Sequence, residues 1–244
     1  MTRVAIIAAM PGELKPLVKS GGKGWHHELR NGVHLWRYRF DEVEWIAACA
    51  GAGVKAATRA FSEIQKDGPL SAVFSIGWAG ALSDEFKAGA VYSISGVIDA
   101  RTGERFPANG SFEECWLVTS PRVADATEKQ RFAATYGAAL VDMEASAVAR
   151  LAAMRDIPFY CIKGVSDAFA DKLPDFNRFI LPDGRFSLAS FIVFALLRPN
   201  HWPALIRMGE NSKSASRGLA KYLLDFLDQS ATIRTRNGYP YLKS

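Results

Sequence analysis

Short apolar runs alternate along this chain with longer segments in which apolar residues recur at helical spacing. The runs that predict strands read RVAIIAAM, VHLWRYRF, EWIAACA, SAVFSIGW, GAVYSISGVI, ALVDM and PFYCIKGVS. The segments that predict helices cover residues 55–66, 144–155, 187–197 and 203–229. Such alternation is typical of layered α/β folds, so we expect a mostly parallel or mixed central sheet flanked by helices.

The chain reads as one domain with a short basic extension. Its 244 residues are 49% hydrophobic, enough for a sizeable core. No internal repeat, low-complexity stretch or change of composition marks a second domain. We therefore expect one domain over residues 1–230 and a basic tail over 231–244. The irregular stretch Asp99–Cys115 reads as a long loop or as the rim of a site.

Charge and cysteine usage favour a cytoplasmic protein that binds neither membranes stably nor nucleic acids. No apolar run approaches the length of a membrane-spanning helix, and the N-terminal segment reads as a strand, not as a signal peptide. The net charge is +5, but the basic residues are scattered except in the tail. Cys49, Cys115 and Cys161 lack metal-binding spacing, so we expect buried thiols and no metal site.

Residues that directly follow the apolar runs are candidates for a binding site, because ligands of open α/β sheets bind beyond the carboxyl ends of the strands. Two of these positions are glycine-rich turns and three carry carboxylates. That composition suits a polar ring or an anion held against backbone amides, with acids nearby. The positions are Met10–Glu13, Gly51–Gly53, Gly77–Gly80, Asp142–Glu144 and Ser166–Asp167.

The two glycine turns each allow two interpretations. The backbone amides of Gly51–Gly53 could face an anion at a helix N-terminus, or the turn could only allow tight packing. GAGVKA is also a relaxed dinucleotide-binding fingerprint, although the next strand does not end in the acidic residue that would bind a ribose. In the second turn, Trp78 either packs under a loop or stacks on a ligand.

The carboxylates also have a structural and a functional interpretation. Glu13, Glu144 and Asp167 could each cap a helix or turn, with Asp142 as a further cap. If Glu144 and Asp167 end neighbouring strands, the two carboxylates would repel unless a hydroxylic group lies between them, and a sugar cis-diol fits that requirement. Asp167 would then act as a general acid that the Ser166 hydroxyl orients.

Taken in order, VAIIAAMPGE, GAGVKAA, SIGWAGAL, VDMEASAVA and IKGVSDAFAD resemble the purine nucleoside phosphorylase superfamily, and most of all its methylthioadenosine/S-adenosylhomocysteine nucleosidases. GERFPAN, DKLP and LLRPNHWPALIRMGENSKSA resemble the hopanoid-associated phosphorylases, which are linked to adenosylhopane. The resemblance implies a three-layer α/β/α sandwich with a mixed, mostly parallel central sheet. It also implies a homodimer or a larger homo-oligomer.

The resemblance assigns roles to single residues of this chain. Glu144 would bind the ribose hydroxyls, and Met143 would lie under the sugar. Asp167, oriented by Ser166, would protonate the leaving purine, and Glu13 would position or activate the attacking water. Gly53, Gly77 and Trp78 would contact substrate, and Gly51 and Arg105 are weak candidates for phosphate binding. Trp78 stands where the nucleosidases carry a serine, which leaves the handling of water or phosphate open.

The reaction that this set predicts is cleavage of the N-glycosidic bond of an adenine nucleoside with an apolar 5′ substituent, with phosphate as acceptor and no other cofactor. Hydrolysis of the same bond is the alternative. A carboxylate that steadies the sugar and an acid that neutralises the leaving base both stabilise an oxocarbenium-like transition state. Two other classes are a dinucleotide-binding protein, which GAGVKA would suggest, and a binding protein without turnover, which Trp78 would suggest.

Overall fold

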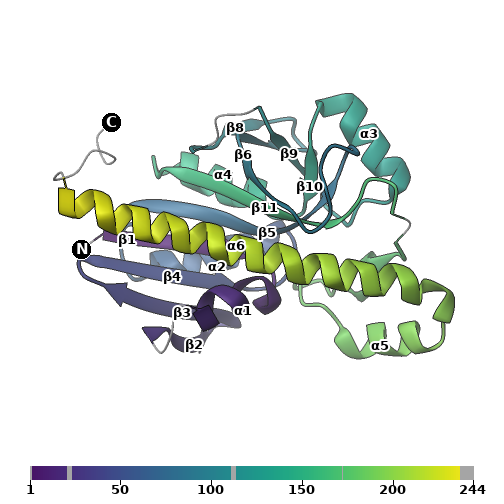
Figure 1. Ribbon diagram of the computed structural model, residues 1–244, viewed down its shortest axis with the longest axis horizontal. Coiled ribbons are helices and arrows are strands. Elements are labelled where there is room, and N and C mark those ends of the chain that lie inside the picture. The colour runs from purple at the N-terminus through teal and green to yellow at the C-terminus, as the bar shows by residue number, and fades with distance from the viewer. Residues whose placement is uncertain (1, 21–23, 111–113, 172, 237–244) are drawn as a thin grey trace.

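The computed structural model describes residues 2–20, 24–110, 114–171 and 173–236, with side chains described up to residue 226. One mixed sheet forms the centre, with the order β2-β3-β4-β1-β5-β10-β9-β7-β8, and β11 joins it through β5 and β6 (Figure 1). The strands are β1 (Thr2–Ala8), β2 (His26–Arg30), β3 (Val33–Phe40), β4 (Val43–Cys49), β5 (Ala72–Ala81), β6 (Val91–Ile94), β7 (Gly96–Asp99), β8 (Arg105–Pro107), β9 (Trp116–Thr119), β10 (Leu140–Asp142) and β11 (Phe159–Asp167).

Parallel ladders join β4, β1, β5 and β11 in the centre of the sheet. Antiparallel pairs add β3 and β2 at one edge and β6 next to β11. The central strands are buried along almost their whole length, as parallel strands covered on both faces must be. The predicted mixed sheet with a parallel centre is therefore confirmed.

Helices cover both faces of this sheet. One buried core cluster lies under α2 and α4, and a second lies on the opposite face under α1 and α6, which confirms the three-layer sandwich. Figure 1 shows α6 crossing the sheet, with α1 beside it and α5 away from the sheet at one end. The helices are α1 (Pro11–Ser20), α2 (Val54–Gln65), α3 (Ala126–Tyr136), α4 (Ala145–Ala153), α5 (Leu188–Leu196) and α6 (Trp202–Arg236), with the short 3-10 helices η2 (Phe176–Phe179) and η3 (Pro199–His201).

The structure corrects several local expectations. Gly77–Gly80 is not a turn, because β5 continues through it to Ala81. The run GAVYSISGVI divides at Ser95 into β6 and β7, which pair with different strands. The stretch Asp99–Cys115 carries β8 and is not only loop. Sequence patterning also missed β2, β9, α1 and α3.

The C-terminal boundary expected between residues 230 and 231 falls inside α6, which runs to Arg236, and residues 237–244 lie outside the described residues. All three cysteines are buried, as expected, and burial raises the pKa of Cys49 and of Cys161 to about 12. No helix in the described part of the chain combines the length and apolarity needed to cross a bilayer.

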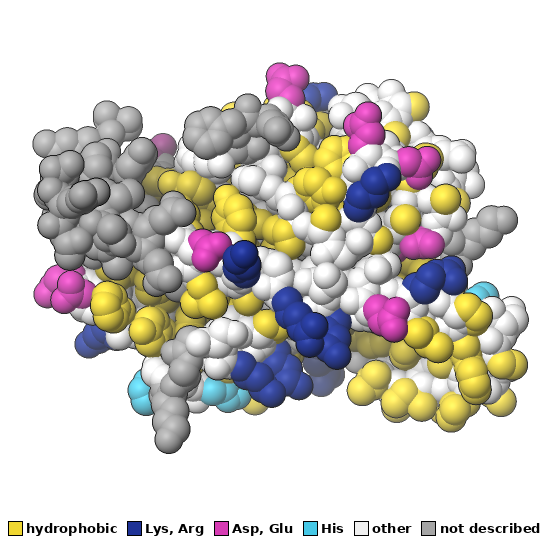
Figure 2. Space-filling view, viewed as in Figure 1, with side chains coloured by type: hydrophobic (Ala, Val, Ile, Leu, Met, Phe, Trp, Pro, Cys, Tyr) yellow, Lys and Arg dark blue, Asp and Glu magenta, His cyan; other side chains and the backbone are white. Residues whose placement is uncertain are grey.

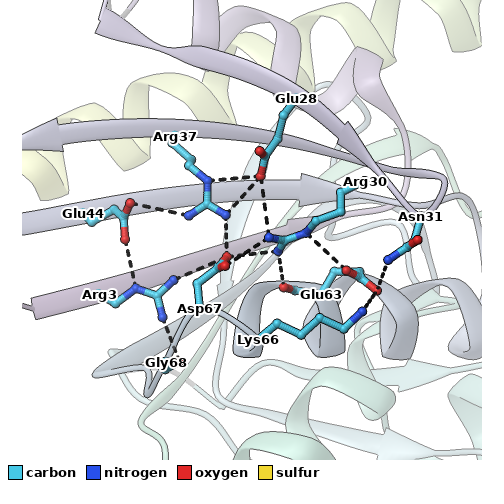
Figure 3. A network of polar contacts seen from close by, with 10 residues as sticks. All are labelled: Arg3, Glu28, Arg30, Asn31, Arg37, Glu44, Glu63, Lys66, Asp67 and Gly68. Carbon is cyan, nitrogen blue, oxygen red and sulfur yellow. Dashed lines mark hydrogen bonds and ion pairs between the residues drawn. The ribbon is translucent and has the colours of Figure 1, made fainter.

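A network of ion pairs connects strands β1, β2 and β3 to the end of α2 (Figure 3). At its centre, the carboxylate of Asp67 lies 3.0 Å from Arg30, 2.5 Å from Arg37 and 3.8 Å from Arg3. These arginines come from β2, β3 and β1, so one carboxylate connects three strands to the end of α2. Hydrogen bonds from Arg30 lower the pKa of Asp67 from 3.8 to about 2, and Arg37 adds to this effect.

We expect Asp67→Asn to destabilise the protein at pH 7 by about 1–2 kcal/mol, allowing for the partial exposure of the group. Because folding depresses this pKa, the stabilisation is complete above pH 3.8 and disappears as the pH falls towards 2. Denaturant unfolding between pH 7 and pH 2.5 measures this. The exposed Asp84 serves as control, and a difference from Asp84→Asn that does not shrink with falling pH would contradict the assignment.

Candidate active site

Two strands bring carboxylates to the same stretch of β5 from opposite sides. β10 runs antiparallel to β5 and pairs Val141 with Gly80, while β11 runs parallel to β5 and reaches Gly80 with Asp167. Glu144 and Asp167 therefore do not end neighbouring strands, as the sequence suggested; each strand pairs with β5 and not with the other. Both strands nevertheless end beside residues 78–80, so the predicted convergence is present.

Glu13 lies in the first turn of α1 and is 3% exposed. Its Oε2 accepts hydrogen bonds from the backbone N–H groups of Ala9 and Met10, each at 2.8 Å. Its Oε1 accepts one from the N–H of Trp78 at 2.8 Å. Burial raises the pKa of Glu13 above 4.5, although these three donors act in the opposite direction.

The backbone at Gly77 makes room for Glu13. Gly77 has a φ of +144°, and a Cβ there would lie 2.8 Å from Oε1 of Glu13. A side chain at position 77 would therefore displace the carboxylate from its donors. Gly77 therefore leaves the space that the Glu13 carboxylate occupies. It does not itself line the cavity at the strand ends.

Asp142, not Glu144, caps the start of α4. Asp142 Oδ2 accepts the N–H of Ala145 at 2.9 Å, and its Oδ1 accepts the hydroxyl of Thr119 at 2.7 Å. The fully buried ammonium of Lys163 lies 2.8 Å from Asp142 Oδ2. Burial disfavours the charge of Lys163, but the adjacent Asp142 carboxylate outweighs it and raises the Lys163 pKa. Asp142 therefore provides the side-chain cap of α4, and the Glu144 carboxylate is not used for capping.

Glu144 reaches across to the glycine turn before α2. Its Oε1 accepts the N–H of Gly53 at 2.6 Å, and its Oε2 accepts the N–H of Met143 at 3.3 Å. The pKa of Glu144 is raised from 4.5 to about 8, mainly by burial and also by the nearby Asp142 carboxylate, while Lys163 partly offsets both effects. Glu144 and Met143 both line the cavity.

Asp167 is held by two donors. The Ser166 hydroxyl donates to Asp167 Oδ1 at 2.6 Å, and the ammonium of Lys129 lies 2.5 Å from Oδ2. Lys129 also donates to the carbonyl of Ala168 at 2.8 Å and is 2% exposed. A Cβ at position 80 would lie 2.9 Å from Asp167 Oδ2 and 3.1 Å from the Cε of Lys129, so Gly80 lets this pair approach β5.

One cavity of about 1260 Å³ joins these groups. Glu13, Met143, Glu144, Ser166 and Asp167 line it, together with Lys129. It continues between α1, α5 and the start of α6, and its wall is apolar on the side of α5 and the start of α6. The volume exceeds the roughly 300–1,000 Å³ typical of small-molecule sites.

Trp78 is used for packing, against two helices and not under a loop, and it also lines the cavity. Its indole Nε1 donates to the Ser216 hydroxyl at 2.9 Å and to the Ser212 carbonyl at 3.2 Å, both on α6. The ring also packs against Gly12 of α1, where a Cβ would lie 3.3 Å away, and it lines the cavity. Trp78 therefore joins β5 to both helices on that face and forms part of the cavity wall.

The structure does not place the two weak phosphate candidates at this site. The N–H groups of Gly51, Ala52 and Gly53 already donate to Ala9, Gly184 and Glu144, so no anion cradle is open in this turn. These same bonds leave no free amides for a dinucleotide phosphate. Arg105 is exposed on β8, where its guanidinium stacks 5.0 Å from the ring centre of Trp116, and it does not line the cavity.

Sequence reasoning missed the two buried lysines of the site. Lys163 had a signal, because a lysine within the apolar run PFYCIKGVS needs a buried partner once that run becomes a covered strand. Lys129 lies on α3, whose start carries a capping box formed by Asp125 and Glu128. Recognising that box would have predicted the helix, but not that Lys129 contacts Asp167.

The three-layer sandwich carries three carboxylates into one cavity at the ends of its strands, and its family match supports an enzyme that acts on N-ribosyl bonds. The model of the phosphorylase superfamily matches residues 3–115 and 112–187, and the chain belongs to this family. No protein among those of curated function matches the sequence.

Solved structures of nucleosidases share the fold. A Helicobacter pylori methylthioadenosine nucleosidase mutant, with 5′-methylthioadenosine in its active site, superposes with a TM-score of 0.72 at 14% identity, over 94% of this chain and 99% of that chain. The futalosine hydrolase of Helicobacter pylori gives 0.72 at 14%, over 93% and 98%. The methylthioadenosine/S-adenosylhomocysteine nucleosidase of Neisseria meningitidis gives 0.71 at 19%, over 94% and 100%.

Proposed function

We propose that this protein cleaves the N-glycosidic bond of an adenine nucleoside with a bulky apolar 5′ substituent and transfers the ribosyl group to phosphate. The observation that carries the proposal is the single cavity that holds Glu144 and Asp167 and continues along an apolar wall. Adenosylhopane, through the resemblance to hopanoid-associated phosphorylases, and methylthioadenosine, through the nucleosidases of the same fold, are the two candidate substrate types.

Glu144 binds the ribose in this proposal. Its carboxylate accepts hydrogen bonds from the 2′ and 3′ hydroxyl groups, and Met143 lies beneath the sugar. Since the N–H of Gly53 holds one oxygen of Glu144 in place, the carboxylate is oriented before substrate arrives. Positive charge that develops on the sugar in the transition state strengthens this contact.

Asp167 and Lys129 act on the leaving base. N7 of adenine becomes basic as the glycosidic bond breaks, and a proton delivered there lets the base leave as a neutral molecule. Asp167 faces the cavity with Ser166 on one oxygen and Lys129 on the other. In the proposed step, the Lys129 ammonium gives a proton to the Asp167 carboxylate, which passes it to N7, so that Lys129 ends as the neutral amine and Asp167 as the carboxylate.

Phosphate is the proposed acceptor because basic side chains line the cavity near Glu13 and Trp78. Lys15 and Lys19 extend from α1, and Lys213 and Arg217 extend from α6. All four are exposed, so they attract a dianion without the cost of a buried unpaired charge. They take the part that the sequence assigned to Gly51 and Arg105.

Water is the second candidate acceptor, and Glu13 is the observation that favours it. Burial raises the pKa of this carboxyl, as a general base working near neutral pH requires. In that case Glu13 accepts the proton of the attacking water, and its three backbone donors fix its orientation.

Chromatography of the released purine base tests the proposal. The substrates are methylthioadenosine, adenosine, inosine and an adenosine with a long 5′-alkyl group, each with and without phosphate. We expect phosphate-dependent adenine release that is fastest with the 5′-alkyl nucleoside, together with ribosyl 1-phosphate product. Equal release without phosphate would establish hydrolysis, and no release from any substrate would refute the enzymatic proposal.

A further inference from the structure

A strongly apolar face covers α5 and the start of α6. In the described part of the chain, seven of the twelve exposed large apolar side chains lie between residues 188 and 206. Leu197 is 77% exposed and Leu196 is 67% exposed. Figure 2 shows these side chains as a continuous apolar area over α5, at the end of the molecule away from the sheet. We call this the α5 face; it consists of Leu188, Ile192, Val193, Leu196, Leu197, Trp202 and Ile206.

The α5 face is held in place from beneath. Phe191 and Phe194 of α5 pack against Phe179 of η2 at ring-centre distances of 5.5 and 5.2 Å. The indole Nε1 of Trp202 donates to the carbonyl of Ala195 at 2.7 Å, which joins the first turn of α6 to α5. The inner aromatic side of α5 is therefore used for packing, and its outer aliphatic side is left for another surface.

The charge around the face is mainly positive. Residues 183–210 contain three arginines, Arg185, Arg198 and Arg207, and two acidic residues, Asp183, which lies 2.6 Å from Arg185, and Glu210. All three arginines are exposed, and the guanidinium of Arg198 lies over the ring of Phe194 at 5.0 Å. Apolar side chains surrounded by arginines and a tryptophan are typical of helices that lie in the interface of an anionic bilayer.

A second copy of this chain is a less suitable partner. A two-fold symmetric contact centred on this face would bring the exposed Arg198 and Arg207 of both copies together, and the neighbouring Asp183 is already paired with Arg185. The family match also ends at residue 187, so the α5 face lies beyond the part that this chain shares with the superfamily model.

The cavity opens at the same place. Leu188, Trp202 and Ile206 of the α5 face also line the cavity that holds Glu144 and Asp167. A molecule whose apolar part rests in the bilayer could thus enter the cavity without passing through water. This consequence rests on the proposed function, but binding of the face to a bilayer does not.

We infer that the α5 face docks this protein on an anionic phospholipid bilayer, with the cavity mouth facing the lipid. Co-sedimentation with vesicles of phosphatidylglycerol and phosphatidylcholine tests the inference. We expect the wild-type protein to bind these vesicles, to bind pure phosphatidylcholine at least tenfold more weakly, and to be partly released by high salt.

The decisive variant is Leu196→Glu with Leu197→Glu, because neither side chain lines the cavity. We expect it to reduce vesicle binding at least tenfold while leaving turnover of soluble methylthioadenosine within twofold of wild type. The matched control is Leu29→Glu with Phe40→Glu, which changes two apolar side chains that are 62% and 57% exposed on β2 and β3. This control should bind vesicles as wild type does.

Light scattering of the same proteins tests the alternative in which the α5 face contacts a second copy of the chain. If wild type binds no vesicles, and the Leu196→Glu, Leu197→Glu variant turns an oligomer into monomers, the face joins copies of the chain and the inference is wrong. Equal vesicle binding by wild type and variant would also overturn it. Vesicle binding without release of any base would uphold the docking surface and refute the proposed function instead.

Discussion

Asp167→Asn is expected to lower kcat/KM for adenine release by roughly 10²–10⁴-fold, the usual contribution of a placed general acid. The amide keeps an oxygen for the ammonium of Lys129, which lies 2.5 Å from the native carboxylate. Unlike the carboxylate, however, the amide cannot take up a proton and pass it to N7. Initial-rate measurements at neutral pH, with thermal unfolding to confirm the fold, give the result.

A buried aspartate elsewhere in the sheet supplies the control for Asp167→Asn. Asp99 is 8% exposed and lies 2.8 Å from Arg150, so Asp99→Asn also removes the buried carboxylate of an ion pair. Asp99 does not line the cavity. We expect Asp99→Asn to lower Tm and leave kcat/KM within about twofold. If both variants lose activity equally, the role of Asp167 is structural and the proposed acid must lie elsewhere.

Glu144→Gln should reduce turnover of ribonucleosides roughly 10²-fold, as expected when two charge-assisted hydrogen bonds to a diol are weakened. The loss should be smaller for a 2′-deoxynucleoside, which presents one hydroxyl fewer. Glu44→Gln is the control, since Glu44 is 9% exposed, pairs with Arg3 at 2.9 Å and lies outside the cavity. An unchanged rate for Glu144→Gln would show that the residue has no part in sugar binding.

The pH dependence gives Glu144 a second signature. Because burial raises its pKa to about 8, the carboxyl of the free protein is mostly neutral below that pH and ionised above it. Since the diol requires the ionised form, kcat/KM of wild type should rise between pH 6 and pH 8 and level off above. Glu144→Gln should lack this rise. Its stability relative to wild type should increase as the pH rises from 4.5 and level off above pH 8, because a raised carboxyl pKa makes the ionised form unfavourable in the folded state.

The sequence predicted the fold well where burial follows a simple period. The buried strands β1, β4, β5 and β11 and the long helix α6 were evident because their apolar residues recur at the spacing of strands or helices. Elements with weak periodicity were missed, as β2 shows with its sequence HHELR and largely exposed side chains. The capping-box signal of α3 was present in the sequence but was not used.

The candidate site residues also divide into those that local sequence patterns predicted correctly and those that they did not. Glu13, Glu144 and Asp167 were identified from their positions after apolar runs, and the structure brings all three to one cavity. Gly51 was chosen as part of a glycine turn after an apolar run, and Arg105 as a basic residue of the irregular stretch. In the structure the N–H of Gly51 donates to Ala9, and the guanidinium of Arg105 stacks on Trp116. The helical period of residues 187–197 predicted α5 but could not reveal that its aliphatic side would remain exposed.

By itself, the sequence determined the layered α/β architecture and which carboxylates stand at strand ends, because both follow from residue type and local spacing. Only the tertiary structure decided their partners: Lys129 meets Asp167 across 38 residues, and Gly53 meets Glu144 across 91. Such contacts depend on strand order and direction, above all on the antiparallel pairing of β10 with β5. A local pattern records whether a side chain is buried, whereas the group it meets there is fixed by distant parts of the chain.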